Sequence, residues 1–270
     1  MAISAGIEPR PGIAVRPILD RYYGLAVSMV SVLAFILLWE FAAGGGWINI
    51  RFTSQPSQVF WAALAIFRSD NFLHHASVSL TEFGLGMALA VLIAIPLGLV
   101  LGTSRRLRLF IEPPLMALYT APRLVLLPIL IVWLGIGMAS KVAVVFLGAV
   151  FPIIINTIAG IREADQRLIQ AARAFGASQL DIYVKVLIPG SLPAILMGIR
   201  LGIGRGLLSV IVGEMFVSEA GIGYQLMSYG QGMQIDKMLV YAFVVSIFGY
   251  ALTVSVQLIE SHIRSWRPNR

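Results

Sequence analysis

Six long apolar runs are the feature that most constrains the fold of this chain. A helix of about 20 apolar residues crosses the ~30 Å hydrocarbon core of a bilayer, and each run is close to that length. Only 12% of the side chains are charged and 58% are hydrophobic, which is outside the usual range of soluble domains. The sequence therefore predicts an all-α membrane protein with six transmembrane helices, over residues 25–43, 83–101, 115–134, 142–159, 192–218 and 238–259.

The distribution of lysine and arginine predicts the orientation of these helices. Cytoplasmic loops of membrane proteins carry an excess of both residues, and alternate loops of this chain are basic. We therefore expect residues 1–24 to be a cytoplasmic N-terminal segment, residues 25–260 to be the transmembrane domain, and residues 261–270 to be a cytoplasmic tail. This topology also accounts for the net charge of +7, so binding of nucleic acid is not expected.

The chain contains few residues that bind metal ions. It has no cysteine and three histidines, His74, His75 and His262. Their positions do not match the spacing of known metal-binding motifs. We expect the histidines to lie in solvated loops or interfaces, and the sequence predicts no metal site.

A polar, amphipathic segment follows the fourth run. Residues 162–189 have strong helix signals but lack the apolar length to cross a membrane. Gly176 is expected to end a first helix, Ser178 to cap a second with Asp181 in its first turn, and Pro189 to end that second helix. The segment therefore predicts a helical hairpin on the cytoplasmic side, between spans four and five. The predicted apolar face of its first helix consists of Ala164, Leu168, Ala171, Ala172 and Phe175.

This segment resembles the cytoplasmic signature of the permease subunits of bacterial ABC importers. That signature reads Glu-Ala-Ala, three residues, Gly, nine residues, Ile-x-Leu-Pro. The same spacing holds here for Gln170-Ala171-Ala172, Gly176, Val186 and Ile188-Pro189. The resemblance extends from about residue 80 to residue 259 and is strongest to the nitrate, sulfonate and taurine importer group. Gln170 replaces the glutamate of the signature, so an ion pair at this position is lost.

The resemblance implies a set of partners and a role for the hairpin. It implies that the hairpin is a coupling helix that docks on a separate ATPase, present in two copies. It further implies a second permease copy, most simply as a homodimer, a periplasmic or lipid-tethered solute-binding protein, and residence in the bacterial inner membrane. The residues expected to couple to the ATPase are Gln170, Ala171, Ala172, Phe175, Gly176, Ala177, Ser178, Asp181 and Pro189.

The chain lacks the loop that binds ATP. A phosphate-binding loop reads Gly-x-x-x-x-Gly-Lys-Ser/Thr, and none of the three lysines, Lys141, Lys185 and Lys237, follows a glycine. We therefore expect this chain not to be an enzyme and to carry no cofactor, with ATP and Mg bound by the partner ATPase.

Two other classes of membrane protein are alternatives. An ion-coupled secondary transporter would need no coupling hairpin, and inverted repeats would be expected in its sequence. A membrane-embedded enzyme would need polar catalytic groups gathered at one depth, and no histidine falls within a predicted span. Both alternatives explain the sequence less well than a permease.

Three ionisable residues stand out at or close to the predicted spans, where charge is costly and commonly functional. Arg123 is expected near the midplane of span three, and Glu82 and Glu214 toward the outer ends of spans two and five. Arg123 either attracts an anionic substrate or pairs with one of these carboxylates, and we favour the ion pair.

Other residues are weaker candidates for the solute path. Met116 and Tyr119 are predicted to line it, together with Glu82, Arg123 and Glu214. Arg200 and Arg205 are expected to reach lipid phosphates from the inner end of span five. The solute is expected to be a small organic or inorganic anion such as nitrate, a sulfonate or taurine, selected mainly by the binding protein.

Overall fold

The computed structural model describes residues 16–68, 70–121 and 123–264, and these are helical apart from short connections. The chain forms two compact units, residues 1–61 and residues 62–270. The predicted cytoplasmic segment 1–24 lies outside the described residues up to residue 15. The predicted tail 261–270 lies outside them from residue 265.

The first unit consists mainly of α1 (Arg16–Gly44), which contains the first predicted span. α2 (Ile50–Thr53) follows, and α3 (Pro56–Arg68) begins within this unit. The backbone N–H and the Oγ of Ser57 donate hydrogen bonds to the Glu40 carboxylate, at 3.0 and 2.8 Å. A carboxylate therefore satisfies donors in the first turn of α3, where negative charge is favourable.

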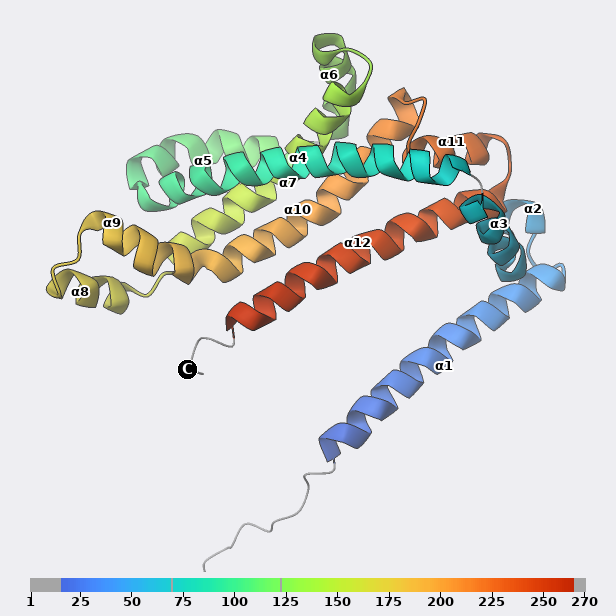
Figure 1. The fold of residues 1–270 in the computed structure, drawn as a ribbon, viewed down its shortest axis with the longest axis horizontal. Coiled ribbons are helices and arrows are strands. Elements are labelled where there is room, and N and C mark those ends of the chain that lie inside the picture. Colours follow the sequence, from blue (N-terminus) through green and yellow to red (C-terminus); the bar gives the residue numbers. More distant parts are fainter. Residues whose placement is uncertain (1–15, 69, 122, 265–270) are drawn as a thin grey trace, which may run out of the picture. The chain divides into compact units, whose positions relative to one another are not determined.

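Three long helices form the centre of the second unit (Figure 1). They are α4 (Asp70–Thr103), α7 (Met138–Arg162) and α10 (Ile188–Val217), and α7 packs along both of the others. α12 (Ile235–Arg264) lies against α10, and α11 (Ile222–Gln231) packs on both of them. Many fully buried core side chains are small or β-branched, including Ala90, Ala94, Val145, Ala149 and Ile153. Such residues let membrane helices approach closely.

Glycines set the distance between these helices. A Cβ atom at Gly198 of α10 would lie 2.9 Å from the Cβ of Asn156 and 3.1 Å from the carbonyl oxygen of Pro152, both on α7. A Cβ atom at Gly86 of α4 would lie 2.5 Å from the Cβ of Val145. The 2.9 Å distance at Gly198 and the 2.5 Å distance at Gly86 are shorter than real Cβ contacts. A side chain at either position would therefore displace the neighbouring helix.

The third predicted span, 115–134, is not one continuous helix, and that prediction is wrong. It is divided between α5 (Arg105–Thr120), a 3₁₀ turn η1 (Arg123–Leu126) and α6 (Leu127–Leu134). Ala121, with φ −59° and ψ 141°, is extended because the residue before a proline avoids the helical region. The first of these helices therefore ends at Thr120, and α6 points away from α5 (Figure 1).

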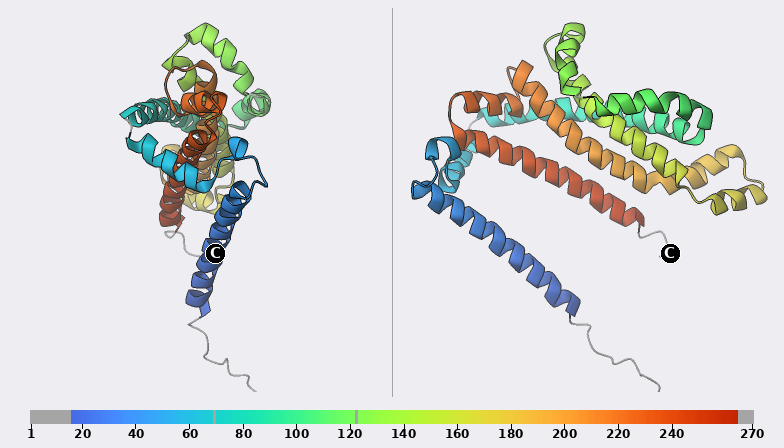
Figure 2. Two further views of the ribbon diagram at one scale, coloured as in Figure 1. Left: turned by 90° about the vertical axis from the view of Figure 1, so that its right-hand side faces the viewer. Right: turned by 180° about the vertical axis from the view of Figure 1, so that it is seen from behind.

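Within the described residues, five helices are long and apolar enough to cross a membrane. They correspond to the first, second, fourth, fifth and sixth predicted spans: 26–44, 71–103, 138–162, 179–217 and 235–262. The hairpin between α7 and α10 and the segment after α10 lie at opposite ends of the helix bundle (Figure 2). The hairpin and the segment after α10 are therefore far apart in the bundle.

Candidate functional site

The hairpin begins with α8 (Gln166–Ala174), whose two ends are both capped. The Asp165 carboxylate accepts a hydrogen bond of 2.9 Å from the backbone N–H of Arg167. At the other end, Gly176 adopts φ +77° and the Ala177 N–H donates to the Ala172 carbonyl at 3.0 Å. This is a glycine-dependent helix end of the Schellman type. The prediction that Gly176 ends the first helix is confirmed.

The second arm begins with α9 (Gln179–Ile182), capped as predicted by Ser178. The Ser178 Oγ accepts a hydrogen bond from the Asp181 N–H, and the Asp181 carboxylate accepts one from the Ser178 N–H, both at 3.2 Å. This is a capping box. Lys185 Nζ lies 2.6 Å from Asp181 Oδ1, which adds an exposed ion pair of small energetic value.

Pro189 does not end the second arm, and that prediction is wrong. A π-helical turn, η2 (Tyr183–Leu187), joins α9 directly to α10, and Pro189 lies in the first turn of α10. The wider turn hydrogen-bonds the Ile188 N–H to the Tyr183 carbonyl. Proline has no N–H to donate and is tolerated in a first turn, where no donor is needed. The hairpin is therefore a helical extension of a membrane helix.

An apolar cluster holds the hairpin together. Ile161 at the end of α7, Ile169 of α8, and Ile182 and Leu187 of the second arm are buried against one another. Partly buried residues surround this cluster: Leu99, Ala164, Ala172, Ala177 and Val186. Leu99 belongs to α4, so the hairpin is anchored to two helices of the bundle.

The predicted apolar face of α8 is therefore divided. Ala164 and Ala172 face the cluster, as expected for an apolar face. Leu168 and Phe175 instead are 57% and 91% exposed. Sequence reasoning missed Ile169, which lies one position from Leu168 on a short helix whose apolar residues nearly encircle it.

We call the outward-facing apolar residues the hairpin surface: Leu168, Ala171, Phe175, Leu180 and Val184. Leu180 and Val184 are 71% and 54% exposed. Gln170 is also exposed and lies next to Ala171. Several large apolar side chains of this one segment are thus exposed, a feature that is typical of a protein–protein contact.

Gly176 contributes to this surface through its backbone. A Cβ atom added there would meet no atom within 4 Å. Its positive φ is strained for any other residue. Within this chain the glycine is therefore required by the turn, and the small size of Ala172 by packing against the cluster.

The second group of predicted residues lies at the other end of the bundle and is buried. Glu82 of α4 and Glu214 of α10 are 1% and 0% exposed. Glu82 forms an ion pair with Lys141 of α7, which also donates a 2.9 Å hydrogen bond to Ser218 Oγ. We call this group the ionic cluster: Ser79, Glu82, Lys141, Glu214 and Ser218.

The ionic cluster fixes the segment that follows α10. Glu214 accepts hydrogen bonds from Ser79 Oγ at 2.6 Å and from the Gly223 N–H at 2.7 Å. Ser79 Oγ in turn accepts one from the Ile222 N–H at 2.8 Å. Gly221 adopts φ +121°, and a Cβ there would lie 2.6 and 2.7 Å from the Glu214 carboxylate oxygens. The glycines of this segment therefore allow its backbone to reach the carboxylate.

His75 belongs to the same region, and the prediction that it is a solvated or interface histidine is wrong. It is 7% exposed, and its Nδ1 accepts a 3.1 Å hydrogen bond from the Gly221 N–H. Sequence reasoning also missed Lys141 as a partner of these carboxylates. A buried carboxylate is stabilised by a nearby cation, and Lys141, directly before the fourth apolar run, was the available signal.

The remaining predicted path residues lie on the divided third span. Met116 is 37% exposed, and Tyr119 accepts a 2.8 Å hydrogen bond from Arg205 Nη2. The backbone of Arg123 opens η1, but its side chain lies outside the described residues. Its pairing with Glu82 or Glu214 stays a prediction.

The two arginines of span five both have partners within the protein. Arg200 forms an ion pair with Glu260 of α12. Arg205 stacks over the ring of Tyr119, with its Cζ 4.6 Å from the ring centroid. The expected reach of both side chains to lipid phosphates stays a prediction.

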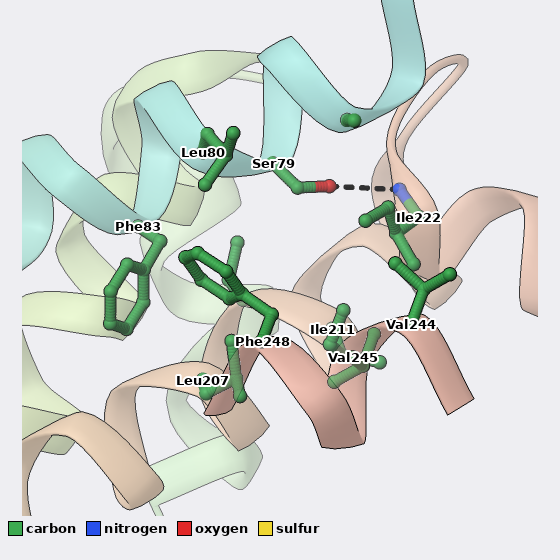
Figure 3. Close-up of a pocket in the computed structure, with 11 residues that line it drawn as sticks. Ser79, Leu80, Phe83, Leu207, Ile211, Ile222, Val244, Val245 and Phe248 are labelled. Carbon is green, nitrogen blue, oxygen red and sulfur yellow. Dashed lines mark hydrogen bonds between the residues drawn. The ribbon is translucent and has the colours of Figure 1, made fainter. Parts of the chain in front are cut away.

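An apolar pocket lies next to the ionic cluster, between α4, α10, α11 and α12 (Figure 3). Ser79 is the one polar side chain among the lining residues, and it is hydrogen-bonded to Ile222 and Glu214. The other side chains shown include Leu80, Phe83 and Phe248. This lining has no group that would recognise a charged solute.

Comparison with known proteins identifies the family. Residues 90–265 match the model of the binding-protein-dependent transport system inner membrane component. SsuC of Bacillus subtilis (strain 168), whose name assigns it to aliphatic sulfonates transport, is 30% identical over 247 residues, covering 92% of this chain and 90% of its own. The taurine transport system permease protein TauC of Escherichia coli (strain K12) is 29% identical over 253 residues, covering 92% and 91%.

The fold is also found in a solved transporter. A chain of the MetNI methionine ABC transporter, in an inward-facing conformation, superposes with a TM-score of 0.63 at 21% identity. The match covers 71% of this chain and 95% of that one. With the family match over most of the helical bundle, these findings show that the chain belongs to the binding-protein-dependent transport system inner membrane components, the permease subunits of ABC importers.

Proposed function

We propose that this permease moves a small anion, a sulfonate such as taurine or an inorganic anion such as nitrate, into the cytoplasm in an ATP-driven complex. The names of SsuC and TauC support a sulfonate. The complex would contain two copies of this chain, two ATPase subunits and an external binding protein. The solute path would lie between the two permease copies.

The topology we propose keeps six crossings, with both termini in the cytoplasm. The third crossing would be made by α5 and α6 together, interrupted at Pro122. The positions of the basic residues support this orientation, because the hairpin then lies on the cytoplasmic side.

The observation that carries the proposed coupling role is the exposed hairpin surface. Phe175 is 91% exposed at the tip of α8, beside the residues that match the family signature, Gln170-Ala171-Ala172 and Gly176. An aromatic side chain in this position is typical of an anchor that fills a pocket on a partner. The ATPase would bind Phe175 and Ala171 directly, with Ser178, Asp181 and Pro189 shaping the second arm.

Co-purification of the permease with its ATPase in detergent tests this role. We expect Phe175→Ala to lower the amount of bound ATPase at least tenfold, because the anchor is removed while the caps of the hairpin remain. Gly176 is a poorer target, since any side chain there strains the turn. The matched control is Phe216→Ala, at the opposite end of α10, where the phenylalanine is 69% exposed.

The outcomes separate the candidate functions. Loss of the ATPase from Phe175→Ala but not from Phe216→Ala supports the coupling role. Full retention by both variants would overturn it. If the wild type binds no ATPase and moves solute along an ion gradient, the chain is a secondary transporter.

A further inference from the structure

A charged side chain lies on the exposed face of α10, halfway along its apolar run. At about 1.5 Å per residue, Arg205 is roughly 20 Å from either end of the run 192–218. Arg205 is exposed, and so are the apolar residues one turn before and after it, Leu201 and Leu208. A guanidinium group at this depth is costly against lipid tails. This face of α10 therefore points toward water or protein.

Arg205 has no acidic partner among the residues that the structure describes. Its Nη2 donates to Tyr119 Oη, and its Cζ lies above the Tyr119 ring. The ion pairs of the described ranges involve other cations, including Arg200 with Glu260 and Lys141 with Glu82. Arg205 is thus a cation at membrane depth whose charge is not neutralised within the described part of the protomer.

We propose that Arg205, held in place by Tyr119, binds the anionic group of the solute as it crosses the membrane. This inference rests on the proposed function, an importer of small anions. A guanidinium carries five N–H donors in a planar fork, and Tyr119 occupies one of them. The others are free to hold two oxygens of a sulfonate or a similar oxyanion.

Tyr119 gives the site its orientation. Stacking and the 2.8 Å hydrogen bond restrict the rotation of the guanidinium, so less conformational freedom is lost when an anion binds. Met116, which is exposed one turn earlier on α5, places an apolar side chain nearby for the carbon part of an organic anion. Two helices that are separate in the sequence therefore contribute to one binding site.

The exposed face of α10 favours a solute over a permanent protein contact. The exposed side chains around Arg205 include Met197, Leu201 and Leu208, so a second copy that packs through the same face offers apolar side chains to Arg205. Two copies would also bring two Arg205 side chains together across the interface, where like charges repel. A bound anion between them removes that repulsion.

Transport by the complete complex tests the inference. The wild-type permease, its ATPase and its binding protein are reconstituted in proteoliposomes. Uptake of taurine, ethanesulfonate, nitrate, acetate and the neutral solute glycerol is measured beside ATP hydrolysis stimulated by the binding protein. The variants are Arg205→Gln, Arg205→Lys and Tyr119→Phe.

We expect Arg205→Gln to lower uptake of the transported anion at least tenfold while stimulated ATP hydrolysis changes less than twofold. Arg205→Lys keeps the charge but loses the fork, so a smaller loss of about three- to tenfold is expected. Tyr119→Phe removes the hydrogen bond and keeps the ring, so its loss is smaller still. Arg200→Gln is the matched control, because loss of its pairing with Glu260 should lower thermal stability and reduce uptake and ATP hydrolysis together.

Each of the other outcomes contradicts either the role of Arg205 or a specific part of the proposed function. If the wild type imports a sulfonate and Arg205→Gln imports it equally well, the inference is wrong and the proposed function stands. The inference is also wrong if Arg205→Gln lowers uptake and ATP hydrolysis in parallel, as Arg200→Gln does, because the residue is then structural. If the wild type imports glycerol and none of the anions, both the anionic substrate class and the role of Arg205 are wrong. If it imports only nitrate or acetate and Arg205→Gln abolishes that uptake, the inference stands and the assignment to sulfonates fails.

Discussion

The two ends of the helix bundle differ in which side chains they expose and which they bury. At the hairpin end, apolar side chains such as Phe175 are exposed, 91% in this case. At the other end, the charged side chains Glu82, Lys141 and Glu214 are buried, with exposures of 5% or less. The hairpin surface leaves apolar side chains exposed, whereas the charges of the ionic cluster meet side-chain and backbone partners within the chain itself.

The buried charges at one end should contribute to the free energy of folding, and the exposed apolar residues at the other end to the free energy of binding a partner. Burying charge is favourable only when every partner is present, so substitutions in the ionic cluster should change the stability of the permease itself. An exposed apolar residue contributes little to stability, and its substitution should change binding to the ATPase instead. Substitutions at the two ends should therefore separate an effect on stability from an effect on ATPase binding.

Lys141→Met should be the most destabilising of these substitutions. It leaves the carboxylates of Glu82 and Glu214 buried without their cation, and removal of one partner of a buried pair costs about 3–5 kcal/mol. Thermal unfolding of the detergent-solubilised permease measures the loss. The double variant Glu82→Gln with Lys141→Met should recover part of it, because one uncompensated charge is removed. A Lys141→Met protein as stable as the wild type would show that the cluster is not structurally important.

Gly221→Ala should cost about 1–3 kcal/mol, because the new Cβ combines a strained positive φ with a clash against the Glu214 carboxylate. Gly204→Ala provides the control, since a Cβ there meets no atom within 4 Å. The control should be neutral or stabilising in a helix by up to about 1 kcal/mol. Equal melting temperatures for the two variants would contradict the role of the glycine in closing the cluster.

Ser178→Ala should cost about 1 kcal/mol locally, the usual value of an N-cap. It removes the Oγ that accepts from the Asp181 N–H and opens the capping box. Hydrogen exchange of the amides of residues 179–183 is the suitable measurement, because the loss is confined to the hairpin. Faster exchange there, with unchanged exchange in α7, is expected. Ser178→Asp restores a capping oxygen and should slow the exchange again.

Phe175→Ala should have the smallest effect on stability, within about 0.5 kcal/mol, because its side chain is exposed. Ile169 of the same hairpin is buried and provides the contrast: Ile169→Ala should cost about 2–5 kcal/mol of local stability. A large fall in melting temperature for Phe175→Ala would mean that this residue supports the hairpin itself, and the comparison between the two ends would fail.

Much of the fold could be predicted from the sequence, because apolar length and helix capping depend on residues that are close together in the chain. Apolar length predicted five of the spans, and the prediction that Ser178 caps a helix with Asp181 in its first turn is confirmed. The break in the third span was missed, because an average hydropathy does not register that the residue before Pro122 avoids the helical region. Pro189 misled in the opposite way, since a π-turn lets the helix continue across it.

A helical membrane protein, its alternating basic loops and the hairpin could be predicted from the sequence, because these depend on composition and on residues that are close in the chain. Which charged side chains contact one another was seen only in the tertiary structure. Lys141 reaches Glu82, Arg200 reaches Glu260 and Arg205 reaches Tyr119, each across a separation that no helical period predicts. The physical reason is that the energy of a buried charge depends on its neighbours in space, and helix packing selects those neighbours.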